Sequence, residues 1–398
     1  MKTVSGILAA DRGFITNAKS VSLSEINFSI AEIQEVDELI RRLRLNSNLQ
    51  YLDLSGCRLF SYDEILLKKL FQCIREMQTL EVINLTNNFP ASPESVWAFN
   101  LTSPFLGQNI LSIQLDSNAV FTYESDSNDL FEDLLTNHPG LQKISISYNC
   151  LGLLSESGLD RFGNALQSSQ LKILDLSGNQ FEQLSLSSFE KLFGDLGAMG
   201  GLRELNLSAN NFSGKPLQVL CNFLERSLAE EVYFNACYLG FMAIEAADLK
   251  TLIQVICGRN VIRKLGVNAN HLDVLSLTTD EEGDDAVESF NFLEMNLSQW
   301  TVLERLDLSN NMLYHYKHAL KLLAKALLLK NPIKSHAGFR NTRIFRDFAN
   351  TGYEDELEML AQETLQQGTN PVLFRPLEVR DSRVCYHIVE PTLKPNFK

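Results

Sequence analysis

This 398-residue chain lacks the residue patterns that mark several protein classes. Its seven cysteines are odd in number and form no Cys-x-x-Cys pair, which argues against a disulfide framework and a zinc ribbon. No stretch reaches the roughly 18 apolar residues of a membrane helix, and Asp11 and Arg12 interrupt the short apolar run near the start, a poor secretory signal. We therefore expect a cytoplasmic protein without a membrane span, whose thiols are all reduced: Cys57, Cys73, Cys150, Cys221, Cys237, Cys257 and Cys385.

Basic residues are also few. The chain has 35 Lys and Arg against 49 Asp and Glu, a formal net charge of −14. Binding to nucleic acid draws its affinity from neutralised phosphates, so this balance argues against such a partner. The acidic residues cluster at 124–133, 280–288 and 354–363. We expect the second cluster to be a solvated loop, because its carboxylates lack the spacing of a calcium loop; a docking loop for a basic partner is the alternative.

Motifs of catalysis are absent from the sequence. It contains no GxxxxGK[ST] phosphate loop, no GxSxG elbow and no HExxH helix. Of the six histidines only His315 and His318 are close together, at helical i, i+3 spacing, with no third ligand in view. The sequence therefore predicts no metal, no cofactor and no enzyme activity.

The dominant feature that is present is a repeat. The pattern apolar-x-x-apolar-x-apolar-x-x-Asn/Cys-x-apolar returns ten times at intervals of 27 to 41 residues, and its clearest copies are LKILDLSGNQF, LRELNLSANNF and LERLDLSNNML. A unit of this length cannot bury its own apolar face, so successive units must stack around a continuous core. The copies begin at Ala18, Leu49, Leu80, Ile110, Leu141, Leu171, Leu202, Ala229, Ile262 and Leu303.

This pattern resembles the leucine-rich repeat over about residues 18–343. The length of each unit and the helical periodicity between the consensus stretches resemble the ribonuclease-inhibitor class. The resemblance implies an α/β solenoid, a horseshoe with a concave parallel β-sheet and convex helices. It also implies a structural role for the asparagine at position 9 of each unit. A worn eleventh copy is expected to begin at Ile333, with Asn341 at position 9.

Within each unit, positions 1, 4, 6 and 11 are expected to point into the core, as at Leu171, Leu174, Leu176 and Phe181. The buried amide at position 9 can satisfy backbone groups of the turn that follows the strand. Two helices are expected to open with capping boxes, Ser61-x-x-Glu64 and Ser187-x-x-Glu190. The position-9 residues form one predicted ladder: Asn88, Asn118, Asn149, Asn179, Asn210, Asn270 and Asn311, with Cys57 and Cys237 at two further units.

Three regions are predicted along the chain: an N-terminal cap at 1–17, the repeats at 18–343, and a capping helix with a tail at 344–398. The open end of a solenoid exposes core and an edge strand, so it needs a cap. The acidic helix expected at 353–367 and its polar tail also resemble C-terminal secretion signals of effectors of intracellular bacterial pathogens. Bacterial leucine-rich-repeat ubiquitin ligases carry a separate catalytic domain, for which the residues after the repeats are too few.

The candidate binding surface is the concave face. Tyr233 is the one large aromatic at position 5, and equivalent positions of successive units lie side by side, so the neighbouring charges should form one patch with it. Arg and Tyr dominate interface energetics. The alternative is a solvated sheet with cross-strand charge pairs such as Glu231 with Lys264. The candidate partner-binding residues are Arg203, Glu231, Tyr233, Arg263, Lys264, Arg305, Tyr148 and Tyr51.

From the sequence we predict a monomeric module that binds another protein through this face, in the setting of a bacterial effector secreted into the host cytosol. A regulator of enzyme activity, such as a GTPase-activating protein, is the alternative from another class, although no residue matches its catalytic positions. An inhibitor is the third possibility, but the concave face is mixed in charge rather than strongly acidic. Fold alone does not name the partner.

Overall fold

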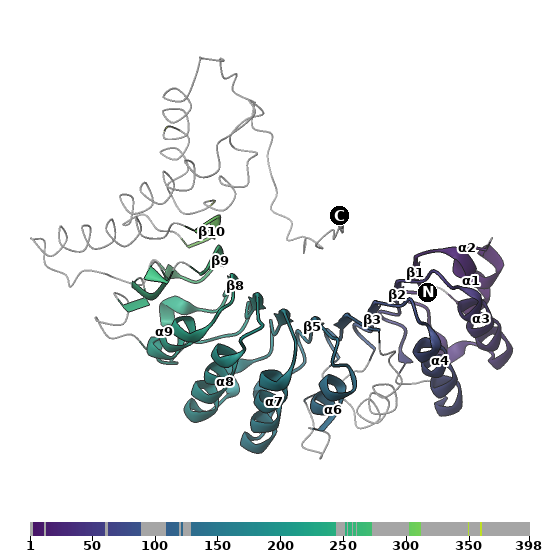
Figure 1. The fold of residues 1–398 in the computed structure, drawn as a ribbon, viewed down its shortest axis with the longest axis horizontal. Helices are drawn as coiled ribbons and strands as arrows, with labels where there is room; N and C mark the ends of the chain where they lie inside the picture. Colours follow the sequence, from purple (N-terminus) through teal and green to yellow (C-terminus); the bar gives the residue numbers. More distant parts are fainter. Residues whose placement is uncertain are drawn as a thin grey trace, which may run out of the picture.

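The computed structural model is an open arc with strands along its inner side and helices along its outer side (Figure 1). It describes residues 3–11, 13–59, 63–88, 109–118, 121, 129–243, 251–272 without 253, 257 and 260, 302–311, 349 and 359. The second acidic cluster, His315, His318, Cys257, Cys385 and nearly all of 344–398 lie outside these residues. The expectations placed on them therefore stay predictions.

Ten three-residue strands form one parallel sheet in chain order, from β1 to β10. Each strand starts at position 3 of its repeat, and equivalent positions pair, as Ile173 does with Glu204 and Glu204 with Glu231. The predicted concave sheet is thus confirmed. The strands are β1 Ser20–Ser22, β2 Tyr51–Asp53, β3 Val82–Asn84, β4 Ser112–Gln114, β5 Lys143–Ser145, β6 Ile173–Asp175, β7 Glu204–Asn206, β8 Glu231–Tyr233, β9 Lys264–Gly266 and β10 Arg305–Asp307.

The helices cover the outer side of the sheet (Figure 1). Packed helices need about 8 to 10 Å where strands need about 4.8 Å, so the helical side must be the longer one and the sheet takes the inside. The described helices are α1 Val4–Ala10, α2 Phe14–Asn17, α3 Ile33–Leu45, α4 Glu64–Glu76, α6 Asp129–Asn137, α7 Glu156–Ser168, α8 Leu186–Ala198 and α9 Leu217–Arg226, with short 3-10 turns η1 Phe28–Ile30, η5 Leu151–Leu153, η6 Phe181–Gln183 and η7 Leu239–Phe241.

Both predicted capping boxes are wrong. Helix α4 is capped by Asp63, whose carboxylate accepts from the backbone N–H groups of Ile65 and Leu66. Helix α8 begins one residue before Ser187, and Ser185 is its N-cap. Asp and Ser are both strong N-cap residues, and the competing candidate lies two residues away in each case, so the pattern alone cannot choose between them.

The core follows the repeat positions. Leu171, Leu174, Leu176 and Phe181 are all at most 1% exposed, as predicted. Aromatic rings at the helix and strand layers then connect successive repeats: Phe193 contacts Phe212 and Phe223 edge-on at 5.7 and 5.6 Å between centroids. Such contacts run from one repeat into the next, so each repeat completes its core only with its neighbours.

The position-9 asparagines form the predicted ladder, and the seven described amides are at most 1% exposed. Asn179 Nδ2 donates to the carbonyl oxygen of Ile146 in the preceding repeat at 3.0 Å and to that of Leu176 in its own at 2.9 Å. Asn179 Oδ1 accepts from the N–H groups of Asn149 and Leu151 at 3.0 and 3.2 Å. One side chain therefore satisfies backbone groups of two repeats.

Cysteine replaces asparagine in two rungs of this ladder. Cys57 Sγ donates to the carbonyl oxygen of Leu23, and Cys237 Sγ to that of Leu207, each at 3.1 Å. Burial raises the pKa of Cys237 to about 12, so its thiol stays protonated and can donate. The five described cysteines are all free thiols, as expected for them.

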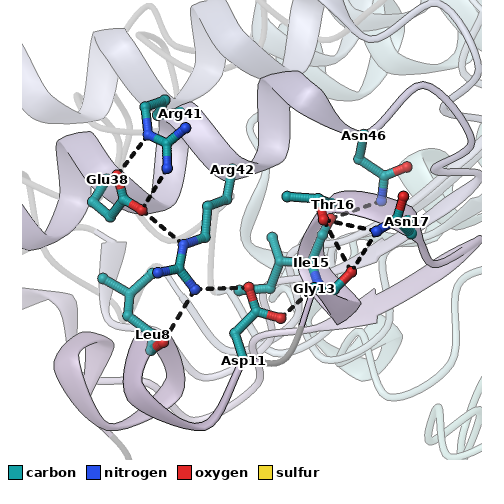
Figure 2. Close-up of polar contacts among 10 residues, drawn as sticks. All are labelled: Leu8, Asp11, Gly13, Ile15, Thr16, Asn17, Glu38, Arg41, Arg42 and Asn46. Carbon is teal, nitrogen blue, oxygen red and sulfur yellow. Dashed lines mark hydrogen bonds and ion pairs between the residues drawn. The ribbon is translucent and has the colours of Figure 1, made fainter.

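The ends of the arc differ. At the N-terminal end, α1 and α2 pack on α3, and Arg42 of α3 binds the end of α1: its Nη1 donates to Leu8 O at 3.0 Å and to Asp11 Oδ2 at 2.8 Å (Figure 2). Asn46 Nδ2 donates to Ile15 O and to Ala18 O, both at 2.8 Å. These bonds fasten the first helices to the first repeat.

At the other end, the eleventh copy expected to begin at Ile333 lies outside the described residues and stays a prediction. In the preceding repeats the N–H of position 8 donates to the carbonyl of position 7 in the next repeat, as Ala269 does to Ser309 at 3.0 Å. The corresponding N–H of Asn310 donates to Ala349 at 2.8 Å. The bonding pattern of the repeats therefore continues at Ala349.

We predict that Asn179→Ala lowers the free energy of unfolding by about 3 kcal/mol, because it leaves buried backbone groups of two repeats without partners. Asn179→Cys should cost about half as much, since a thiol keeps the donor, as Cys57 and Cys237 do. Urea unfolding followed by circular dichroism measures both. The matched control is Asn222→Ala on the exposed side of α9, expected within about 0.5 kcal/mol of wild type. Equal losses for Asn179→Ala and the control would contradict the ladder.

Candidate functional site

Six of the eight predicted site residues lie together on the last four strands of the concave sheet. Three of them occupy position 3 of their repeats, which is the first residue of the strand: Glu231 in β8, Lys264 in β9 and Arg305 in β10. These residues pair directly across the sheet. Tyr233 lies two residues along β8, on the same face. Arg203 and Arg263 lie at position 2, just before β7 and β9. Tyr51 on β2 and Tyr148 after β5 lie apart from this group.

The position-2 residues form a continuous chain of ion pairs along the edge where the strands begin. Glu230 binds Arg203 through Oε1 and Arg263 Nη1 through Oε2, the latter at 3.2 Å. Arg263 also binds Glu304. Both arginines are therefore engaged with glutamates of neighbouring repeats. Arg203 and Arg263 nonetheless keep 63% and 46% of their side chains exposed.

The position-3 charges are paired too. Lys264 Nζ lies 2.5 Å from Glu231 Oε1, the pairing that the alternative interpretation predicted. Arg305 pairs within its own strand with Asp307 at 3.3 Å. Exposed pairs of this kind add little stability. Their main effect is to fix where the charged groups lie on the concave face.

Tyr233 is only partly exposed on the concave face. Its side chain is half-buried, and its hydroxyl donates to Glu231 Oε2 at 3.0 Å. Burial, followed by the charge of Glu231, raises the pKa of Tyr233, so the phenol remains a neutral donor. A Cβ added at Gly266, which pairs with Tyr233 across β9, would meet Tyr233 Cδ1 at 2.8 Å. The ring therefore lies over Gly266 and uses the space left by the missing side chain.

Tyr233 stands at position 5, where several other repeats have a side chain that bonds to the turn after the strand. In other repeats an Asp or Asn there accepts from the N–H of position 7: Asp175 from Ser177 at 2.9 Å and Asn206 from Ser208 at 3.0 Å. Tyr233 cannot make this bond. Its position-7 neighbour, Asn235, donates instead to Ser208 Oγ at 3.2 Å. The fold therefore accommodates Tyr233 by a substitute bond and does not require it.

Tyr148 repeats the same arrangement at position 8. It is 56% exposed with a left-handed backbone, φ 54°. A Cβ on Gly178, at position 8 of the next repeat, would overlap its ring. Sequence inspection could have found both cases, because each tyrosine is followed by a glycine at the same position of the next repeat.

Sequence reasoning missed two further features of this region. Asp175 and Glu204 are half-buried carboxylates on β6 and β7, and the pKa of each is raised, primarily by burial. On the loop after β8, Tyr238 and Phe241 are 44% and 45% exposed and both pack against His271, with ring centroids 5.6 and 5.2 Å away. Exposure of this kind depends on the loops around a residue, which the repeat pattern does not encode.

The part of the chain that the structure describes holds neither a metal cluster nor a membrane-spanning helix. Within those residues, no group of three or more His, Cys, Asp or Glu side chains is arranged to hold a metal ion. The same residues include no helix with both the length and the apolar character to cross a bilayer. The groups that the concave face offers for binding are the charged, amide and aromatic side chains described above.

Comparison with known proteins gives three results. A model of the family described as Leucine Rich Repeat matches residues 48–72, 170–192 and 201–223. No curated protein sequence matches the chain. Among solved structures, the leucine-rich repeat-containing protein LegL7 from Legionella pneumophila is similar with a TM-score of 0.53 and 18% identity, covering 84% of this chain and 98% of that one.

Two other solved structures are similar over shorter stretches. Human 5T4 has a TM-score of 0.37 and 16% identity, with 61% of this chain and 79% of that one covered. The tropomodulin C-terminal domain of Caenorhabditis elegans has a TM-score of 0.30 and 13% identity, with 41% and 92% covered. The ten-stranded parallel sheet, the family matches and the likeness of fold to LegL7 agree with one another. This chain carries leucine-rich repeats and folds as an α/β leucine-rich-repeat solenoid.

Proposed function

We propose that this chain is a protein-binding module that holds a partner on the concave face over β7 to β10. The observation that carries the proposal is Tyr233. It forfeits the position-5 bond that Asp175 and Asn206 make, and the repeat replaces that bond through Ser208. A large ring kept on an open sheet face at the expense of a local bond is well suited to anchor a partner.

The surrounding charges support this assignment. Ion pairs hold Arg203, Arg263, Lys264 and Arg305 in fixed positions before any partner arrives. Preorganised side chains lose less entropy on binding, so the same contacts yield more affinity. Tyr148 and Tyr51 extend the proposed surface toward the N-terminal repeats, with Tyr148 the more exposed of the two.

The proposed setting is a bacterial effector that acts as a monomer on a host protein in the host cytosol. The likeness of fold to a Legionella pneumophila leucine-rich-repeat protein supports this setting. We also propose that the repeats are of the ribonuclease-inhibitor-like class, because α3, α4, α7 and α8 are full helices of 13 residues each. Binding, and not catalysis, is the proposed activity.

The double variant Tyr233→Ala/Arg263→Ala should weaken partner binding by about 2 kcal/mol, as expected when hot-spot residues are truncated. Host proteins captured by the immobilised full chain supply the partner, whose affinity for wild type and variant is then measured by calorimetry. The melting temperature should fall by only a few degrees, because both side chains are partly exposed and make weak surface pairs.

The matched control is Lys69→Ala, which breaks an ion pair with Asp37 on the helical side. It should leave affinity unchanged. A double variant that binds the partner as tightly as wild type would place the interface elsewhere. If the captured partner is a small GTPase and the chain accelerates its hydrolysis of GTP, the alternative of an enzyme regulator would be favoured.

A further inference from the structure

Glu204 differs from every other charged residue at position 3 of β7 to β10. Glu231 and Lys264 pair with each other, and Arg305 pairs with Asp307. The side-chain carboxylate of Glu204 makes no hydrogen bond or ion pair with any residue in the part of the chain that the structure describes, although it is half-buried at the middle of the concave face. Leaving a partly desolvated carboxylate unpaired is costly for the folded state.

Asp175 lies diagonally from Glu204 on the neighbouring strand, since it pairs with Asn206, and it adds to the negative charge. Its Oδ2 accepts from Asn206 Nδ2 at 2.9 Å and its Oδ1 from Ser177 N at 2.9 Å, but it has no ion pair among the described residues. The charge of Asp175 adds to the raised pKa of Glu204 after burial and Glu231, while the charges of Lys143 and Lys264 oppose the rise. The two carboxylates present oxygens on the same face of β6 and β7.

The nearest cations cannot neutralise this pair by contact. Lys264 is bound by Glu231, the residue opposite Glu204 on β8. Lys143 lies two strands away on β5, with Ile173 between it and Glu204 in the register. The cationic side chains at repeat positions 3 and 5 from β5 to β10 are Lys143, Lys264 and Arg305. Lys264 and Arg305 are already paired with acidic side chains, so the centre of the face stays negative.

We propose that the partner inserts an arginine side chain, carried by a basic segment, between Asp175 and Glu204. This inference rests on the proposed function and names the chemistry of its central contact. A guanidinium presents several N–H donors in one plane and matches carboxylate oxygens better than a single ammonium does. Tyr233 lies one strand beyond Glu204 at position 5, and its ring leans over Gly266 on β9, where it can contact the segment that carries the arginine.

The first experiment measures protein stability, because an unpaired, partly buried Glu204 carboxylate should destabilise the fold. Its pKa is raised above the ordinary value of 4.5, mainly by burial and then by the charge of Glu231. The native state therefore holds this proton more tightly than the unfolded state, and ionisation destabilises the fold above its raised pKa. Glu204→Gln should raise the melting temperature by about 1 to 2 °C at pH 7. The gain should vanish well below pH 4.5, where the carboxyl is protonated in both the native and the unfolded state. A fall at pH 7 would mean that the carboxylate has a stabilising partner.

The binding chemistry is tested with a capped hexa-arginine peptide and the full chain, by calorimetry at low salt. Glu204→Gln should weaken binding about tenfold. Glu64→Gln on the helical side changes the net charge by the same amount and should change the affinity less than twofold. A capped hexa-glutamate peptide should not bind the wild-type chain.

Equal weakening by Glu204→Gln and Glu64→Gln, or no binding of hexa-arginine to wild type, would overturn the inference. Preferred binding of hexa-glutamate would assign the centre of the face to Lys143 and overturn it as well. These outcomes differ from failure of the proposed function, in which the captured partner ignores Tyr233→Ala/Arg263→Ala. A partner that requires Tyr233 and Arg263 but tolerates Glu204→Gln would refute only the arginine contact.

Discussion

The hydrogen bonds of the position-9 side chain are the interaction on which the rest of this structure depends. A three-residue strand cannot hold two neighbours by its own backbone pairing, and the turn after it would leave buried N–H and C=O groups without partners. The amide of Asn179 bonds to backbone groups on both sides of one repeat boundary. Repetition of this rung from Cys57 to Asn311 makes separate small units into one body.

The binding face is a consequence of that stacking. Because the rungs fix the register, residues about 30 positions apart in sequence come to lie side by side, as Glu204, Glu231 and Lys264 do. The same register lets Tyr233 lie over Gly266 and Tyr148 over Gly178. A shift of one residue would turn these side chains to the other face, so surface chemistry and core packing are specified together.

Much of this could be predicted from the sequence. The strands, the buried positions and the asparagine ladder follow from a period that repeats, since each position has the same surroundings in every unit. The N-caps of α4 and α8, the ion-pair chain through Glu230 and the place of Ala349 did not follow. They depend on competition between similar residues a few positions apart, such as Asp63 with Ser61, or on rotamers of long side chains. The unpaired Glu204 was hidden for the same reason, because its neighbours could have paired with it.

Native-state hydrogen exchange tests most directly whether the ladder unites the repeats. With exchange followed by mass spectrometry in increasing denaturant, the backbone amides of β5 to β8 should open together, with one free energy close to that of global unfolding. The account predicts that Asn149 and Asn179, whose backbone N–H groups each donate to the asparagine of the next rung, show the same protection. Separate opening of single repeats, each with its own lower free energy, would contradict it.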